Sequence, residues 1–304
     1  MSISRRNFLA QSALLFSAAA YRPSFMLAQA NPPMLKPTFH FFTKPFVGLS
    51  YQEIAKHVVA IGYDGVEVPI RKKEIREGAD VIDEIPKMVE AYRNEKLDVV
   101  TLTTDIIDVS KASRTEEILR AAQKCGVKRF RMGWYRYDNT KPIWPQLDSF
   151  RSKFHDLVTL AKEIGIQPIY QNHSGAKMAG AGIWDIALLM KDYPLSEVAW
   201  AFDMMHAKVE GGLSWPTEFA LASDRLGVVQ FKNYVWENNV PRSVSLASGL
   251  VNKESVGVLK KINYAGPCLI HIEYLKGDIK QPDFLANVIK ASKDDLVTLQ
   301  NWWK

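Results

Sequence analysis

Eight short apolar runs alternate with eight longer amphipathic segments, and this alternation constrains the fold more than any other feature of the sequence. Strands that alternate with helices of this length are typical of βαβ units with a parallel sheet. In the longer segments apolar residues recur at three- and four-residue spacing, as in Ile54, Val58 and Ile61. The predicted strands are 38–42, 65–70, 97–103, 128–134, 166–173, 198–204, 227–234 and 268–274. The predicted helices are 50–61, 80–95, 114–125, 146–164, 182–192, 215–225, 253–263 and 281–302.

The junctions between these units repeat as well. Gly62, Gly126 and Gly165 directly follow predicted helices, and the segment 263–266 has the same place after a later one. Glycine after a helix suits the left-handed cap conformation. Eight such units in about 270 residues predict an α/β fold, a single-domain (β/α)8 TIM barrel over residues 31–304. The alternative is an open doubly wound sheet, which usually has a glycine-rich phosphate loop after its first strand; residues 41–48 contain none.

Two segments stand out as candidate lids over a site at one end of the barrel. The first, 134–145, is rich in proline and tryptophan, and the second is the long loop predicted at 235–252. Binding residues are often carried on such loops.

The first thirty residues have the character of an export signal. Arg5 and Arg6 precede Phe8 and Leu9 and resemble a twin-arginine motif, and a mild apolar stretch follows at 9–20. Ala28 and Ala30 supply small residues for a cleavage site. We therefore expect residues 1–30 to be a Tat signal peptide and the protein to be periplasmic. A disordered or amphipathic tail, or an uncleaved anchor, remains the alternative.

Charge and cysteine content exclude several classes of protein. The formal charge of +6 falls to +3 without the arginines at 5, 6 and 22, and no basic run with interleaved aromatics occurs. This argues against a nucleic-acid partner. The apolar stretch at 9–20 is shorter than the about 20 residues that span a bilayer, so we expect no stable membrane insertion. Cys125 and Cys268 form no CxxC or zinc pattern and are expected to be buried small hydrophobic residues.

Polar side chains gather at the carboxyl ends of the predicted strands, where barrel enzymes have their active sites. Four of the six histidines are expected there: His40, His173, His206 and His271. Because side chains alternate along a strand, Gln171 shares a face with His173, Gln230 with Lys232, and His271 with Glu273. Inward polar residues at a strand end need partners, a ligand or a metal ion. The sequence therefore predicts a polar pocket at this end of the barrel.

At these residues the chain resembles the xylose isomerase-like superfamily, in particular its sugar phosphate isomerase/epimerase branch. The resemblance covers roughly residues 37–302. Members carry site motifs at the ends of strands five to eight. The corresponding segments here, in that order, are 171–173 (Gln-Asn-His), 203–206 (Asp to His), 230–233 (Gln-Phe-Lys-Asn) and 271–274 (His-Ile-Glu-Tyr).

The resemblance implies one divalent ion, Mn, Mg or Ca, held by the residues at the family's ligand positions. Those positions carry Gln171, Asp203, Gln230 and Glu273 in this chain. Family members commonly have Glu, Asp, His and Glu there, so this site has lost one carboxylate and one imidazole. Glutamine oxygens bind hard cations weakly and carry no charge. Metal binding and a metal-free site are therefore both open.

The resemblance also implies a mechanism, and Gln171 changes it. Family epimerases use two carboxylates on opposite faces of the sugar, and the carboxylate of the fifth strand is missing here. One-base chemistry survives, in which Glu273 removes a proton α to a carbonyl. The enolate is stabilised by Lys232, with His206 or a metal ion as alternatives, and His173 or His271 serves as general acid. The candidate substrate-binding residues are His206, Asn172, His271 and Trp134.

Three short segments look like a branch found in exported proteins of sugar-degrading bacteria, linked to 3-keto-glycoside cleavage. They are Gln171–Gly175, Asp203–Ala207 and Val209–Gly212. The resulting hypothesis is an enzyme that acts on a small carbohydrate, a sugar or 3-keto-glycoside, by isomerisation or elimination. The alternative is a non-catalytic periplasmic sugar-binding barrel. An abasic-site nuclease, which shares this barrel, is disfavoured because the two glutamines do not suit its trinuclear metal site.

Overall fold

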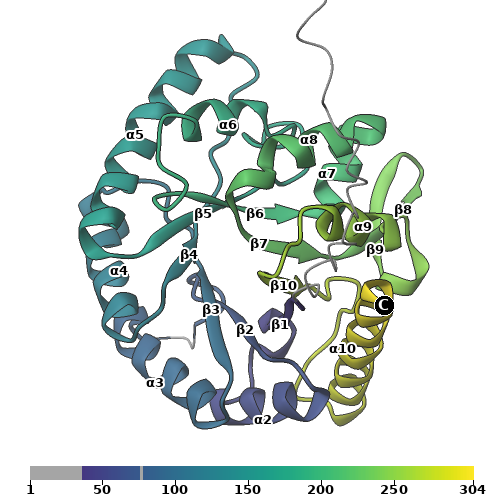
Figure 1. Cartoon of the computed structure of the whole chain (residues 1–304). Helices are drawn as coiled ribbons and strands as arrows, with labels where there is room; N and C mark the ends of the chain where they lie inside the picture. The colour runs from purple at the N-terminus through teal and green to yellow at the C-terminus, as the bar shows by residue number, and fades with distance from the viewer. Residues whose placement is uncertain (1–35, 76–77) are drawn as a thin grey trace, which may run out of the picture. The chain divides into compact units, whose positions relative to one another are not determined.

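The computed structural model describes residues 36–75 and 78–304, and the predicted signal peptide at 1–30 lies outside this range. Eight parallel strands close into a barrel in the order β1-β10-β7-β6-β5-β4-β3-β2, and helices surround it (Figure 1). The barrel strands are β1 Thr38–Phe42, β2 Gly65–Pro69, β3 Asp98–Thr103, β4 Arg129–Arg131, β5 Gln167–Gln171, β6 Ala199–Asp203, β7 Leu226–Phe231 and β10 Pro267–Ile270. The predicted TIM barrel is confirmed, and with it all eight strands.

The helices follow the predicted amphipathic segments, with ends that shift by a few residues. They are α2 Tyr51–Ile61, α3 Val81–Asn94, α4 Thr115–Lys124, α5 Ile143–Ile164, α6 Trp184–Met190, α7 Met204–Gly211, α8 Trp215–Ala222, α9 Lys253–Lys261 and α10 Pro282–Trp303. Short 3-10 turns lie at Lys44–Phe46, Lys111–Ser113, Gly212–Ser214, Ser223–Arg225 and Leu246–Ser248. None of the helices in the described part of the chain has the length and apolar character needed to cross a membrane.

The helix ends show why these segments begin and end where they do. Ser50 caps α2 in a reciprocal capping box with Glu53. Gly62 and Gly165 end α2 and α5 with φ of 107° and 82°, which only glycine adopts at little cost. After α9 this positive-φ position belongs to Asn263, with φ of 50°, and not to Gly266. Asparagine also tolerates the left-handed region.

The prediction of a loop at 235–252 was wrong in part. Strands β8 Asn233–Glu237 and β9 Val240–Val244 pair antiparallel and form a hairpin beside the barrel (Figure 1). Asn238 and Asn239 form its two-residue turn with φ of 51° and 60°. Two positive φ values are what a type I′ turn requires, and asparagine favours it.

Helix α7 was also missed, because it follows β6 without any intervening loop. Asp203 ends the strand and caps the helix, since its carboxylate accepts hydrogen bonds from the backbone N–H groups of Met205 and His206. The other candidate lid, 134–145, is a short segment held by backbone hydrogen bonds to a neighbouring loop. The backbone of Tyr135 and Tyr137 is hydrogen-bonded to the loop after β5, and α5 already begins at Ile143.

The core has an outer and an inner part. A large apolar cluster fills the space between strands and helices, with Phe154, Leu157 and Trp200 among its buried members. A second cluster is built from inward positions of the strands and comprises Val100, Ile169, Ala199, Ala201, Val228 and Leu269. This inner cluster is the floor beneath the polar residues of the barrel.

Candidate active site

Period-two alternation stacks the inward side chains of the barrel in layers. On β5, β7 and β10 the floor residues Ile169, Val228 and Leu269 are each followed two positions later by a polar residue, and two positions after that by another. The middle layer has Gln171, Gln230 and His271, and the upper layer has His173, Lys232 and Glu273. The predicted pairs therefore do share a face, and they lie above the apolar floor.

Glu67, at the middle of β2, is the anionic centre of the middle layer and is fully buried. Its carboxylate forms an ion pair with Arg131 at 3.1 Å and accepts hydrogen bonds from His271 at 2.8 Å and Gln230 at 3.2 Å. Thr103 also donates to it. Burial would raise the pKa of Glu67, but the charges of His271 and Arg131 outweigh it and lower the pKa to about 2. Glu67 is therefore an ionised, fully paired structural carboxylate.

Lys232 lies above this network and bridges two carboxylates. Its ammonium Nζ is 3.3 Å from Oδ2 of Asp203 and 3.2 Å from Oε2 of Glu273. Burial opposes the charged form of Lys232, but the two carboxylates outweigh it and raise its pKa. The same ammonium group is the main reason why the pKa of Glu273 is held far below its usual range. Glu273 is the most accessible of the three, with 32% of its side chain exposed.

Asp203 is held in place from several sides. Asn172 brackets it, because the Asn172 amide donates to the backbone carbonyl of Asp203 and accepts from its backbone N–H. Oδ2 of Asp203 also accepts a hydrogen bond from Gln171 at 2.9 Å. Both polar atoms of the Asn172 side chain are thus used within the protein. The structure gives Asn172 a role in positioning Asp203, and its contact with substrate stays a prediction.

His173, His206 and Trp134 form one wall of the site. The His173 ring lies 3.9 Å from the His206 ring and 4.7 Å from the Trp134 ring, measured between centroids. Nδ1 of His173 donates to the carbonyl of Ser174, so the lone pair of the neutral ring is on Nε2. Burial and the Lys232 charge lower the His173 pKa to about 4. Two members of this wall have a buried nitrogen without a hydrogen-bond partner among the described residues, His206 Nε2, which lies 3.8 Å from Asp203 Oδ2, and Trp134 Nε1.

The other two histidines that were predicted to lie in the site, His40 and His271, do not face its opening. His40 is hydrogen-bonded to Thr38 and lies close to Gly65, both at strand starts, so the prediction that it belongs to the site is wrong. His271 does lie in the barrel, but it is buried, bonded to Glu67 and stacked on Phe42. It supports the middle layer beneath the residues that face the opening.

Two residues of the site escaped the sequence analysis, Glu67 and Arg131. Arg131 is buried, bonded to Gln171 and Thr103, and packed against the Phe42 and Trp134 rings. Each is a charged residue at an inward position of a strand, and this placement is the sequence signal that could have identified them as site residues. They were missed because the position two residues after each carries proline or glycine and so supplies no second polar side chain.

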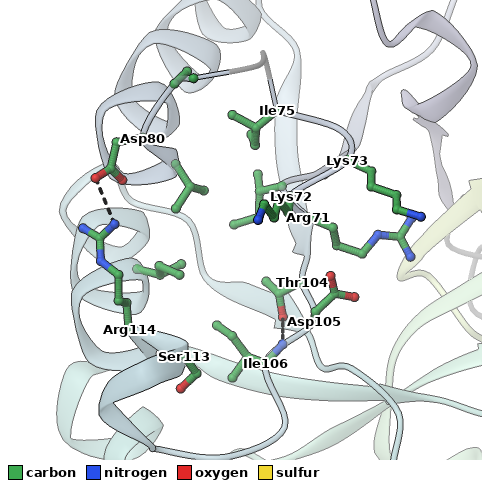
Figure 2. A pocket seen from close by; sticks show the side chains of 15 residues that line it. Arg71, Lys72, Lys73, Ile75, Asp80, Thr104, Asp105, Ile106, Ser113 and Arg114 are labelled. Atoms are coloured by element: carbon green, nitrogen blue, oxygen red, sulfur yellow. Dashed lines mark hydrogen bonds and ion pairs between the residues drawn. The ribbon is translucent and has the colours of Figure 1, made fainter.

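Two cavities adjoin this end of the barrel. One, of about 490 Å³, lies between the segments after β1 and β10 and reaches Glu273, with Lys44 and Lys276 on its wall. The other, of about 980 Å³, lies between the segments after β2 and β3 (Figure 2). Arg71 and Asp105 line the latter, and Asp80 and Arg114, which also line it, form an ion pair at 2.9 Å. Both volumes are of the size of small-molecule sites.

The comparison with protein families decides the ancestry. The family described as "Xylose isomerase-like TIM barrel" matches residues 55–294. The chain belongs to this family. Among curated protein sequences no relative matches this xylose isomerase-like barrel.

Solved structures show the same fold at low sequence identity. A putative xylose isomerase from Rhodospirillum rubrum is 14% identical, with a TM-score of 0.70 over 86% of this chain and 99% of that one. The 3-keto-D-glucoside 4-epimerase of E. coli is 17% identical, with a TM-score of 0.63 over 88% and 100%. A probable 3-DHS dehydratase from Bacillus anthracis is 13% identical, with a TM-score of 0.65 over 86% and 98%.

The predicted metal ligands of this xylose isomerase-like barrel do not fit a divalent ion as they are arranged. The Gln171 oxygen accepts from Arg131, and both oxygens of Asp203 already accept hydrogen bonds. Lys232 lies between Asp203 and Glu273. Within residues 36–75 and 78–304, no group of three or more His, Cys, Asp or Glu side chains is placed to hold a metal ion.

Proposed function

We propose that this barrel is an enzyme that removes a proton α to a carbonyl of a sugar or a 3-keto-glycoside. The observation that carries the proposal is the Lys232 ammonium group, fixed between Asp203 and the partly exposed Glu273. A carboxylate next to a buried cation is the pairing that enolate formation needs: one group takes the proton and the other stabilises the charge that develops.

In the proposed reaction Glu273 takes the α proton, and the C–H electron pair moves into the carbonyl to give an enolate. The Lys232 ammonium is already in place to stabilise the negative charge that develops on a nearby carbonyl oxygen. The protonated Glu273 then returns its proton. In an isomerisation the proton goes to the former carbonyl carbon, and the proton of the adjacent hydroxyl passes to the former carbonyl oxygen, so that the carbonyl moves to the neighbouring carbon. In an elimination the enolate electron pair breaks the C–O bond β to the carbonyl, and the proton goes to the departing glycosidic oxygen. Nε2 of His173, with its free lone pair, is placed to exchange a proton with a substrate hydroxyl.

Two-base epimerisation is disfavoured by the residue at the family's fifth-strand ligand position. Gln171 carries an amide where a second carboxylate would act, and the amide is bonded to Arg131 and Asp203. An amide does not take up a proton at neutral pH. The proposal is therefore isomerisation or elimination, and the fold similarity to an epimerase and a dehydratase is compatible with either.

The test is turnover of a panel of 3-keto-glycosides and ketoses by the wild type and by Glu273→Gln. We expect Glu273→Gln to lower kcat by about 10²–10⁴-fold, because it removes the base without changing the shape of the side chain. Asp278→Asn is the matched control, since Asp278 lines the same cavity but is not paired with Lys232. Unchanged turnover in Glu273→Gln would refute the mechanism.

The low pKa of Glu273 favours a second candidate function, a non-catalytic sugar-binding barrel. A carboxylate that is stabilised this strongly in its ionised form is a weak base. A binding protein would show thermal stabilisation by a sugar of the same panel, with no product formed. Any product released by wild type and not by Glu273→Gln would exclude this candidate.

We also propose that the protein is exported through the twin-arginine pathway. The support is the Arg5-Arg6 motif with its apolar stretch and Ala28–Ala30, all of which lie outside the described residues. Cell fractionation of a bacterium that expresses the full chain tests this. We expect the periplasmic fraction to contain the protein, and the double substitution Arg5→Lys, Arg6→Lys to retain it inside. Equal distribution of the two forms would argue against export by this route.

A further inference from the structure

The oxygens of the four predicted metal ligands are largely occupied by cationic or N–H donors of the protein itself. Oδ1 of Asp203 accepts from two backbone N–H groups, and its Oδ2 accepts from Gln171 and faces Lys232. The Gln171 oxygen faces the Arg131 guanidinium. Of these side chains only Gln230 has a buried oxygen without a partner in the described structure. This oxygen and the Glu273 oxygen that does not face Lys232 are far fewer than the six or more ligands that hard cations take.

We propose that the Lys232 ammonium permanently occupies the place between Asp203 and Glu273 that a divalent ion would take, so that this site binds no divalent metal while Lys232 is present. The distances of 3.3 Å and 3.2 Å from Nζ to the two carboxylates define that place. This inference deepens the proposed function, but it concerns the source of the positive charge and does not depend on the substrate.

The charge of the buried cluster supports the same assignment. Three carboxylates, Glu67, Asp203 and Glu273, surround two cations, Arg131 and Lys232. A divalent ion beside Lys232 would put three units of positive charge within a few ångströms, in a part of the protein where charges are weakly screened. The ammonium group is covalently attached to the residue that directly follows β7 and cannot exchange with solvent ions.

Removal of Lys232 should therefore create the metal site that the wild type lacks. In Lys232→Met the carboxylates of Asp203 and Glu273 would face each other across the vacated space with no cation between them. Such a pair of anionic oxygens attracts a hard cation. Metal binding by Lys232→Met should need both carboxylates. The double variant Lys232→Met, Asp203→Asn should therefore no longer bind the metal ion.

The experiment is a titration with MnCl2 of the full chain that has been treated with EDTA and desalted, followed by thermal unfolding and by the EPR signal of free Mn²⁺. At about 1 mM Mn²⁺ we expect an unchanged Tm for the wild type and a rise of about 3 °C or more for Lys232→Met. Lys276→Met is the control, because it removes a positive charge from the Glu273 cavity without opening the space next to Asp203.

Stoichiometric loss of the free Mn²⁺ signal on addition of wild-type protein would overturn the inference, and it would leave the α-proton chemistry standing. No Mn²⁺ binding by a folded Lys232→Met, checked by circular dichroism, would overturn it as well. If Lys232→Met does not fold, the Mn²⁺ titration of the wild type tests the inference by itself: binding overturns it, and no binding supports it. Activity does not enter any of these readouts, so failure of the proposed reaction is a separate result.

Discussion

At the scale of single residues, Glu67 shows how the barrel tolerates charge in its interior. Its carboxylate is fully buried, and it is paired with Arg131 and hydrogen-bonded to Thr103, Gln230 and His271. A buried charge without such partners would be costly, whereas a fully paired one fixes the geometry of its neighbours. Arg131 and His271 thus receive defined positions under the opening of the site.

We expect Glu67→Gln to destabilise the protein by about 3 kcal/mol at pH 7, because it leaves the Arg131 guanidinium buried without its counter-charge. The folded pKa of about 2 lies below the ordinary value of 4.5. The stabilisation by Glu67 is therefore complete above pH 4.5 and is lost as the pH falls towards 2. Urea unfolding at pH 7 and at pH 4 should show a smaller difference between wild type and variant at the lower pH.

The control for this prediction is Glu116→Gln, which breaks an exposed ion pair with Arg120 on α4. This substitution should lower the free energy of unfolding by less than about 1 kcal/mol, because solvent screens both charges. Equal effects of the two substitutions would show that the middle layer does not depend on the Glu67 charge.

At the scale of elements, the alternation of apolar and amphipathic segments predicted the barrel well and its end regions less well. Strands and helices were found because their periods of two and 3.6 persist over several residues. The hairpin β8–β9 was missed although Asn238-Asn239 is a turn signal, since the polar residues around it suggested a loop. Helix α7 directly follows β6, so no loop residues in the sequence mark its start. Where a segment has both loop-like and strand-like or helix-like residues, its tertiary contacts decide which structure forms, and the sequence does not show those contacts.

The candidate site divides in the same way. The residues on and just after β5, β7 and β10 could be predicted because two polar positions, two residues apart, mark the end of each strand. The position two residues after Glu67 and after Arg131 carries proline or glycine instead. Partners could not be predicted at all. That Asn172 brackets Asp203, and that Lys232 bridges two carboxylates, depends on which strands are neighbours and on their register.

Asn233 joins the hairpin to the segment before α9, and we expect Asn233→Asp to loosen both. The amide of Asn233 donates to the carbonyls of Leu246 and Val251 and accepts from the backbone of Tyr234 and Val251. A carboxylate cannot donate, so two carbonyls would face a negative charge. Hydrogen exchange at 246–251 should become faster, with a loss of stability of about 1–3 kcal/mol. Asn239→Asp, at the exposed turn, should leave both unchanged.

At the scale of the whole molecule, β1 closes the barrel by pairing with both β2 and β10. A chain that begins at Pro37 keeps every strand, and we expect it to unfold in one cooperative thermal transition. A chain that begins at Lys44 lacks β1 and leaves the edges of β2 and β10 unpaired. We expect the shorter chain to lose that transition and to expose apolar surface, measured by calorimetry and dye binding. A cooperative transition of the shorter chain would mean that the barrel tolerates an open seam.

The layers inside the barrel have a consequence for how this protein can change over evolutionary time. The floor residues pack together and the middle-layer residues are bonded to one another, whereas Glu273 in the upper layer is partly exposed. Selection for a new substrate can therefore work on positions such as Trp134 and His173 while the framework beneath them stays constant. Mutant libraries confined to the upper layer should contain a larger share of folded, functionally diverse variants than libraries of equal size that include Glu67 and Arg131.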